Sequence, residues 1–250
     1  MTEKLLNDNA NDTAASVSKS TIRENIENIR KNVESALCES GRDTDVNIMA
    51  ATKTVSPDMI NYAINECGLT DIGENRVQEL LSKYDSIDKE NVRIHFIGSL
   101  QPNKVKYIID KVCLIHSLDS MSLAKEISKR ASAKDIVMSV LIEVNIGEEE
   151  SKGGVLLKNV TALADDIKDL PGISLAGLMT MAPKCEDKSG YYGYFEKVRE
   201  LFDDMNAKGY FKAEKPILSM GMSESYEIAV RCGSTLIRPG SAIFGKRNAH

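Results

Sequence analysis

Several residue types and patterns are scarce or missing in this 250-residue chain, and each absence excludes a class of protein. Tryptophan is absent and aromatic residues make up 5% of the sequence, which argues against the stacking platforms that bind single-stranded nucleic acid. The formal net charge is -5 and no dense cluster of lysine and arginine occurs, so no nucleic-acid surface is expected. No apolar run approaches the ~20 residues needed to span a bilayer, and we therefore expect no membrane segment.

The five cysteines are odd in number and widely spaced, without a CxxC pair or a Cys/His grouping at zinc spacing. This excludes a disulfide framework and predicts no metal site. Cys38, Cys67 and Cys113 lie on apolar stretches, where we expect buried, reduced thiols. Reduced thiols are typical of the cytosol.

The N-terminal residues 1–19 lack the apolar core of a signal peptide and are rich in Asn, Asp, Ser and Thr. A segment of this kind cannot bury enough apolar surface to fold, so we predict a disordered lead-in. A single folded domain over residues 20–250 is expected to follow it. The protein is therefore predicted to be cytoplasmic.

A regular alternation of strand and helix patterns fills the rest of the chain, after a first predicted helix over residues 20–40. The predicted strands are residues 46–53, 70–75, 92–97, 113–117, 137–144, 175–181, 217–220 and 235–238. Eight strand–helix units in about 250 residues predict an α/β fold, a single (β/α)8 TIM barrel with an extra N-terminal helix. A doubly wound open sheet is the alternative, but the turn after the first strand lacks its GxGxxG pattern.

Lys53 ends the first predicted strand, where the chain emerges from the core. A lysine in that place can lose its proton and attack a carbonyl to form a Schiff base. The plain alternative is that its side chain extends into solvent at the strand end. Taken alone, the position of Lys53 favours the plain alternative.

The last two strands end in loops of small residues, which include Ser223 after one strand and Gly240 and Ser241 after the other. TIM barrels commonly bind phosphate between these two loops through free backbone N–H groups. Each loop alone is equally consistent with a tight turn that needs a glycine. Together, beside the first strand, the two loops favour a phosphate site.

Arg238 ends the last strand, which closes next to the first strand in a barrel, so Arg238 and Lys53 should face one opening. An ion pair between Arg238 and Glu74 or Glu143 is the alternative, which the spacing leaves open. A lysine nucleophile, an arginine and a phosphate cradle together describe a site for pyridoxal phosphate. There the aldehyde meets the lysine and the arginine meets the pyridine nitrogen.

Six motifs in chain order make a resemblance to a known family specific. They are AATKT (50–54), DIGENRVQE (71–79), HFIGSLQ (95–101) followed by Asn103 and Lys104, GLMTM (177–181), LSMGMS (218–223), and GSTLIR (233–238) with AIFG (242–245). This set resembles the YggS/PROSC family of pyridoxal phosphate homeostasis proteins, over about residues 22–247.

The resemblance implies a barrel like the N-terminal domain of bacterial alanine racemase, with pyridoxal phosphate bound covalently to Lys53 as an internal aldimine. Carried over by motif, the cofactor-binding residues are Lys53, Asn75 near the ring, Arg238 at the pyridine nitrogen, and Ser223, Gly240 and Ser241 at the phosphate. Two positions depart from the family pattern. Pro239 removes one backbone donor where isoleucine is common, and Ser241 replaces a frequent threonine, which should keep the same backbone contact.

A racemase also needs a second acid–base group on the opposite face of the substrate from the lysine. In the resembling racemases this group is a tyrosine from an additional C-terminal domain, which we do not expect in this chain. All eight tyrosines fall on predicted helices or their approaches, and His95 and His116 fall inside strands, where we expect hydrogen-bonded core groups. An arginine at the ring nitrogen also makes the ring a poorer electron sink. No catalytic residue is therefore predicted.

These observations predict a protein that binds pyridoxal phosphate, buffers it and supplies it to apo-enzymes, without strong catalysis and as a monomer. The rival hypothesis is a single-domain racemase that uses pyridoxal phosphate on amino acids. A third hypothesis, a barrel that binds a phosphorylated metabolite with Lys53 as a substrate Schiff base, explains the loops but not the motif set.

Overall fold

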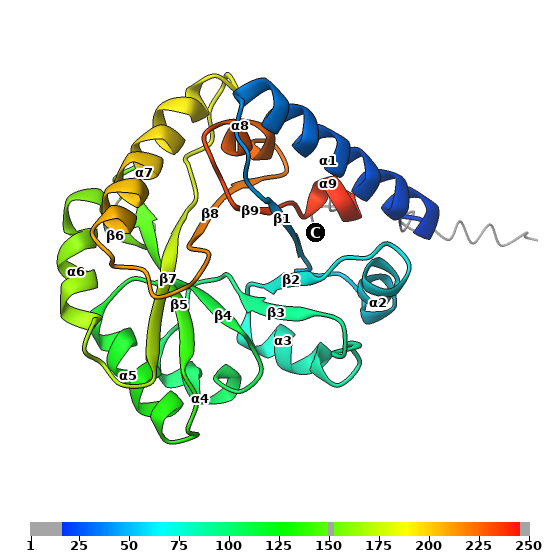
Figure 1. Ribbon diagram of the computed structural model, residues 1–250. Helices are drawn as coiled ribbons and strands as arrows, with labels where there is room; N and C mark the ends of the chain where they lie inside the picture. Colours follow the sequence, from blue (N-terminus) through cyan, green and yellow to red (C-terminus); the bar gives the residue numbers. More distant parts are fainter. Residues whose placement is uncertain (1–16, 150–152, 246–250) are drawn as a thin grey trace, which may run out of the picture.

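The computed structural model describes residues 17–149 and 153–245 and begins with the long helix α1 (Lys19–Ser40). The Ser18 hydroxyl accepts the Thr21 N–H and so caps the helix start, and Gly41 ends the helix in a left-handed conformation. A buried stripe of isoleucines at helical spacing packs α1 onto the barrel beside α8 (Tyr226–Arg231) (Figure 1). The extra N-terminal helix is thus confirmed, and most of the predicted lead-in, residues 1–16, lies outside the described residues.

The strands of the described residues all run parallel and close into a ring (Figure 1). They are β1 (Asn47–Ala51), β2 (Asp71–Glu74), β3 (Arg93–Phe96), β4 (Leu114–Leu118), β5 (Met138–Asn145), β6 (Val155–Leu156), β7 (Ile173–Thr180), β8 (Ile217–Met222) and β9 (Leu236–Arg238). β1 pairs with both β2 and β9, and β4 pairs with β5. The two-residue β6, which was not predicted, adds to β5 outside the ring. The eight-stranded barrel is therefore confirmed.

The helices follow the strands in the predicted order. They are α2 (Pro57–Asn65), α3 (Val77–Tyr84), α4 (Val105–Ile108), α5 (Met121–Ser132), α6 (Val160–Ile167), α7 (Gly190–Ala207), α8 and the short α9 (Ser241–Phe244). The 3-10 turns η1 (Pro102–Lys104) and η2 (Leu157–Asn159) directly precede α4 and α6. In the described part of the chain, no helix is long and apolar enough to cross a membrane.

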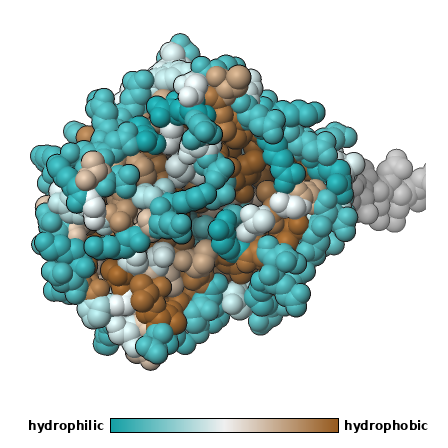
Figure 2. Space-filling view, in the orientation of Figure 1, coloured by the Kyte–Doolittle hydropathy of each residue, from teal (hydrophilic) through white to brown (hydrophobic). Residues whose placement is uncertain are grey.

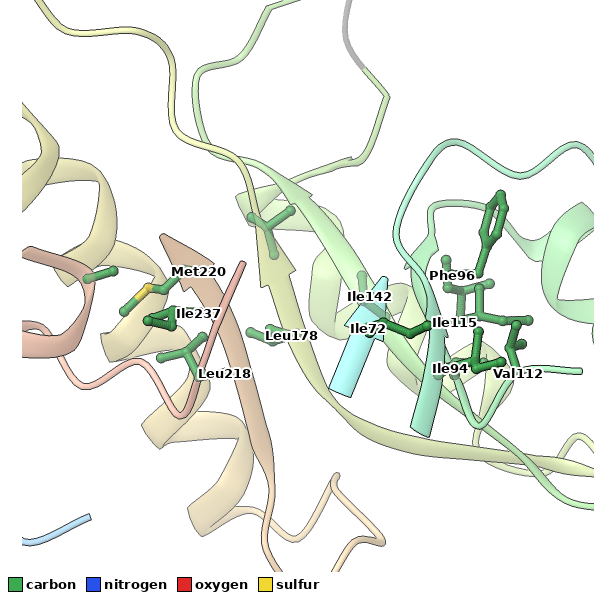
Figure 3. Close-up of a cluster of buried hydrophobic side chains, with 14 of the residues drawn as sticks. Ile72, Ile94, Phe96, Val112, Ile115, Ile142, Leu178, Leu218, Met220 and Ile237 are labelled. Atoms are coloured by element: carbon green, nitrogen blue, oxygen red, sulfur yellow. The ribbon is translucent and has the colours of Figure 1, made fainter. Parts of the chain in front are cut away.

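Alternate residues of each strand point to opposite sides of the sheet, which sorts the core into two parts. Outward-facing side chains such as Ile94, Phe96 and Ile237 fill the layer between strands and helices (Figure 3). Small apolar clusters inside the ring include Leu141 and Met179. Much of the interior is polar, however, whereas bulky apolar residues usually dominate there. These buried polar residues inside the barrel include groups of the candidate functional site.

The predicted burial of the cysteines is correct only in part. Cys67 is buried, but Cys38 and Cys113 are exposed. Cys38 lies outside the buried stripe of α1, and Cys113 precedes the first residue of β4, before the strand enters the core. All five cysteines are free thiols.

Candidate functional site

Lys53 lies two residues beyond β1 at the carboxyl end of the barrel. The Ala51 N–H donates to the Pro239 carbonyl oxygen at 3.0 Å, which fixes the end of β1 against the loop that follows Arg238. Lys53 is half-buried, and among the described residues its Nζ has no hydrogen-bond or ion-pair partner. The predicted proximity of the end of β1 to the end of β9 is thus present, and the amine is free to meet a ligand.

The backbone beside Lys53 is strained. Thr54 has a φ of 63°, a left-handed conformation that a β-branched residue adopts only when its surroundings impose it. Its N–H donates to the Glu79 carboxylate of α3. The helix therefore holds the turn that presents Lys53.

A buried ionic network continues behind this turn, between the barrel wall and α3. The Lys83 ammonium donates to Glu79 at 2.6 Å, to Glu74 at 3.1 Å and to the Thr52 carbonyl oxygen at 3.0 Å. The Thr52 hydroxyl donates to the same oxygen of Glu74 at 2.7 Å. Burial raises the pKa of the fully buried Glu74, and the Lys83 cation opposes that rise. Lys83 was not predicted from the sequence, where its spacing four residues after Glu79 was the one available signal.

Arg238 is a buried cation inside the barrel and forms no ion pair with any described residue. Its guanidinium donates to the Ser219 hydroxyl at 2.5 Å and to the Thr180 carbonyl oxygen at 2.8 Å. Because a guanidinium carries five N–H groups, three remain for a ligand. Burial lowers the pKa of Arg238 to about 10, although Glu143 nearby opposes the shift. The alternative ion pair with Glu74 is excluded, since Glu74 pairs with Lys83.

The loops after β8 and β9 meet at Ser223. Its hydroxyl oxygen accepts the N–H groups of Gly240 at 3.1 Å and of Ala242 at 3.0 Å. Gly240 approaches Ala51 so closely that a Cβ would lie 3.2 Å from the Ala51 carbonyl oxygen. Ser241 is exposed, and the N–H of Ala242, which was not predicted, faces Ser223 instead. The two loops thus meet in one cluster of polar groups, but the Gly240 and Ala242 N–H groups are not free as predicted, because both donate to Ser223.

Two other predicted positions border this opening. Asn75 follows β2, is half-buried, and its backbone packs against Gly98, where a Cβ would lie 2.0 Å from the Asn75 carbonyl oxygen. Pro239 is buried and still accepts a hydrogen bond from β1, so its missing donor does not detach the loop. Met181 and Met222, at the ends of β7 and β8, expose 38% and 42% of their surface. On the face of the molecule drawn in Figure 2, apolar side chains are exposed in patches between hydrophilic ones.

Glu143 of β5 is a buried carboxyl group near Arg238. Burial and repulsion by Asp119 raise its pKa from 4.5 to about 7, and Arg238 opposes the rise. A raised folded-state pKa means that the protonated carboxyl stabilises the fold below about pH 4.5, and that this contribution is lost as the pH rises through about 7.

Glu143→Gln, a neutral mimic of the protonated carboxyl, is therefore expected to raise the free energy of unfolding at pH 8 by about 1–3 kcal/mol. At pH 5 the variant and the parent should be equally stable. Urea denaturation at both pH values measures the difference, and Glu214→Gln on the surface serves as the matched control. Equal stability of the variant and the parent at pH 8 would contradict the raised pKa of Glu143.

The comparisons with known proteins agree with this geometry. Residues 17–248 match the family model of the alanine racemase N-terminal domain. The pyridoxal phosphate homeostasis protein of Aquifex aeolicus is 44% identical over 90% of this chain and 97% of its own length. That of Escherichia coli is 33% identical over 91% of this chain and 97% of its own length.

Solved structures show the same fold. PipY of Synechococcus elongatus, solved with PLP bound, is 26% identical with a TM-score of 0.76 and covers 90% of this chain and 100% of its own. Alanine racemase from Corynebacterium glutamicum is 15% identical with a TM-score of 0.71, and this chain covers 63% of it. The chain thus belongs to the pyridoxal phosphate homeostasis protein family, whose barrel is that of the alanine racemase N-terminal domain.

Proposed function

We propose that this protein binds pyridoxal phosphate at the carboxyl end of its barrel and serves the homeostasis of this cofactor. One observation carries the proposal. The Lys53 amine, which has no partner among the described residues, follows a strand whose end is hydrogen-bonded to the loop after β9. That loop begins after the unpaired cation Arg238 and continues to the N–H groups that meet Ser223. These groups match the aldehyde, the pyridine nitrogen and the phosphate of the cofactor. PipY, which was solved with PLP bound, supports this choice of cofactor.

Each group has a distinct role in this proposal. When bound, the cofactor supplies an electrophilic aldehyde. The Lys53 amine would hold the cofactor by displacing the oxygen of that aldehyde as one water molecule and forming a C=N bond to its carbon. Arg238 donates an N–H to the ring nitrogen, and Asn75 lies beside the ring. Ser223 and the Ser241 N–H border the phosphate, which takes over the Gly240 and Ala242 N–H groups that donate to the Ser223 hydroxyl in its absence.

A carrier explains the site better than a racemase does. The arginine at the ring nitrogen keeps that nitrogen unprotonated, which weakens the ring as an electron sink for a carbanion. The curated relatives from Aquifex aeolicus and Escherichia coli are named for homeostasis rather than for turnover. Release of the cofactor to apo-enzymes, a cytosolic setting and a monomeric state complete the proposal.

Reconstitution tests the proposal. Purified protein mixed with pyridoxal phosphate should stay yellow after the excess cofactor is removed, and borohydride reduction followed by peptide mass analysis should locate one adduct on Lys53. Mixing the loaded protein with the apo form of a PLP enzyme should restore the activity of that enzyme. A protein that takes up no cofactor would refute the proposal, and sustained racemisation of L- or D-amino acids would favour the racemase.

A further inference from the structure

A continuous row of hydrogen-bonded side chains crosses the inside of the barrel and ends at the arginine of the proposed site. We call it the interior chain; its members are Asp71, His95, His116, Ser219 and Arg238. They come from β2, β3, β4, β8 and β9, and all are buried. Such a row is a costly feature inside a barrel, because every buried polar group must be paired. A continuous row of this kind therefore indicates a role beyond packing.

Consecutive members of the interior chain are within hydrogen-bond distance. The Asp71 carboxylate meets His95 Nε2 at 2.8 Å, and His95 Nδ1 meets His116 Nε2 at 3.0 Å. His116 Nδ1 meets the Ser219 hydroxyl at 3.1 Å, and that hydroxyl accepts from Arg238. The row therefore links the start of β2 to the carboxyl end of β9.

The protons of this row can be assigned. Burial lowers the pKa of His95, but Asp71 and Cys113 outweigh it and raise the value to about 9. Burial and repulsion by His95 and Arg238 keep the pKa of His116 well below its ordinary value. At neutral pH His95 therefore donates from both nitrogens, and the neutral His116 accepts at Nε2 and donates from Nδ1. The Ser219 oxygen is held between two donors.

The outer end of the row is anchored as well. The Asp71 carboxylate accepts two hydrogen bonds from the Arg93 guanidinium, at 2.9 and 2.8 Å, and one from the Thr70 hydroxyl. A carboxylate fixed by so many donors cannot rotate, so it holds the plane of the His95 ring. Through their hydrogen bonds, the His95 ring in turn fixes the His116 ring, and the His116 ring fixes the Ser219 hydroxyl.

The orientation of Arg238 depends on this order. No described carboxylate pairs with its guanidinium, so only Ser219 and Thr180 fix the plane of the group. A guanidinium donates well only along the directions of its N–H bonds, which makes its plane decisive for any acceptor. Loss of either contact would leave the buried cation free to turn.

We propose that the interior chain positions the Arg238 guanidinium so that one N–H points at the ring nitrogen of the bound cofactor. The inference rests on the proposed function, because it needs the ring to lie against Arg238. The two histidines and Ser219 are positioning residues in this arrangement and do not touch the cofactor themselves. Supporting residues of this kind are what keep a binding group within a fraction of an ångström of its working geometry.

The test measures the ring nitrogen directly. Full-length protein is loaded with ring-¹⁵N-labelled pyridoxal phosphate, and the ¹⁵N resonance is recorded for the parent, Ser219→Ala and His116→Leu. Both variants are expected to move this resonance downfield, because a poorly aimed guanidinium donates a weaker hydrogen bond to the nitrogen. Their affinity for the cofactor should fall roughly tenfold, as for a lost hydrogen bond to a charged group.

Two further variants separate positioning from general damage. Ser234→Ala removes an equally buried hydroxyl that bonds only backbone carbonyls of β8 and β9, so it should leave the ring resonance unchanged even if it destabilises the fold. His116→Asn keeps an N–H that can reach Ser219 and should restore the resonance toward that of the parent. Because Ser219→Ala removes a single oxygen atom, it carries the test if His116→Leu does not fold.

The outcomes distinguish this inference from the proposed function. A parent protein that takes up no pyridoxal phosphate would overturn both. A loaded parent together with loaded Ser219→Ala and His116→Leu variants that all share one ring-nitrogen resonance would overturn the positioning role alone. The positioning role would also be overturned if Ser234→Ala moved the ring-nitrogen resonance as far as Ser219→Ala does.

Discussion

Lys53→Ala is expected to abolish the absorption band of the C=N bond that the protein gains with pyridoxal phosphate, because alanine has no amine to bond to the aldehyde. The groups at Arg238, Ser223 and Gly240 are untouched by the substitution. The variant should therefore still bind the cofactor noncovalently and lose it on dialysis. Absorbance spectra before and after dialysis, and mass spectra after borohydride reduction, measure the two effects.

The fold of the Lys53→Ala variant should be unaffected, because the Lys53 ammonium has no partner among the described residues. Lys53→Arg keeps a positive charge but cannot form the C=N bond, and it should behave like the alanine variant. Lys104→Ala removes a lysine from η1, at the same end of the barrel, and should retain full absorption. A reduced adduct found on another lysine of the Lys53→Ala variant would show that Lys53 is not the anchor.

The parts of this site that the sequence predicted are those set by the topology. Each barrel strand is a short apolar, β-branched run, so a strand end is visible in the sequence and its residues can be assigned to one opening. The placement of Lys53 and Arg238 at one opening follows from that rule, since β1 pairs with β9 in a closed ring, whereas their cofactor roles were predicted from the family resemblance. The loops at Ser223 and Gly240 follow from the same closure.

The parts that were not predicted depend on side-chain packing. Lys83 has the pattern of a solvent-facing residue of an amphipathic helix, and only the outward-facing Glu74 on the neighbouring strand makes it buried. His95 and His116 were expected as hydrogen-bonded core groups, which is confirmed. Their direct contact could not be predicted, because it depends on the register of two parallel strands.

Among the substitutions proposed for this protein, one in the buried network at Lys83 should lower the free energy of unfolding most. Lys83→Met keeps the length of the side chain but leaves the fully buried Glu74 without its cation. Removal of one partner of a buried pair typically costs about 3–5 kcal/mol, and we expect a loss of that size in the free energy of unfolding at pH 7. The turn at Thr54 also depends on Glu79, which Lys83 holds, so cofactor uptake should weaken as well.

The pH dependence of this loss gives the sharper measurement. The folded-state pKa of Glu74 is already raised by burial, and Lys83 is the cation that limits the rise. Without Lys83 the folded protein should bind a proton at Glu74 more tightly than the unfolded chain does. Its stability should then recover as the pH falls through the raised pKa. Urea denaturation of the parent and the variant at pH 7 and pH 5 measures the recovery.

A second substitution separates charge from packing. Lys83→Met combined with Glu74→Gln removes both charges, and it should regain much of the stability that Lys83→Met alone loses, because no unpaired ion remains buried. Lys208→Met, which breaks an exposed pair with Asp204 on α7, is the matched surface control and should stay close to the parent. Because the whole expectation rests on one uncompensated carboxylate, a double variant that is no more stable than Lys83→Met at pH 7 would show that the network acts through packing instead.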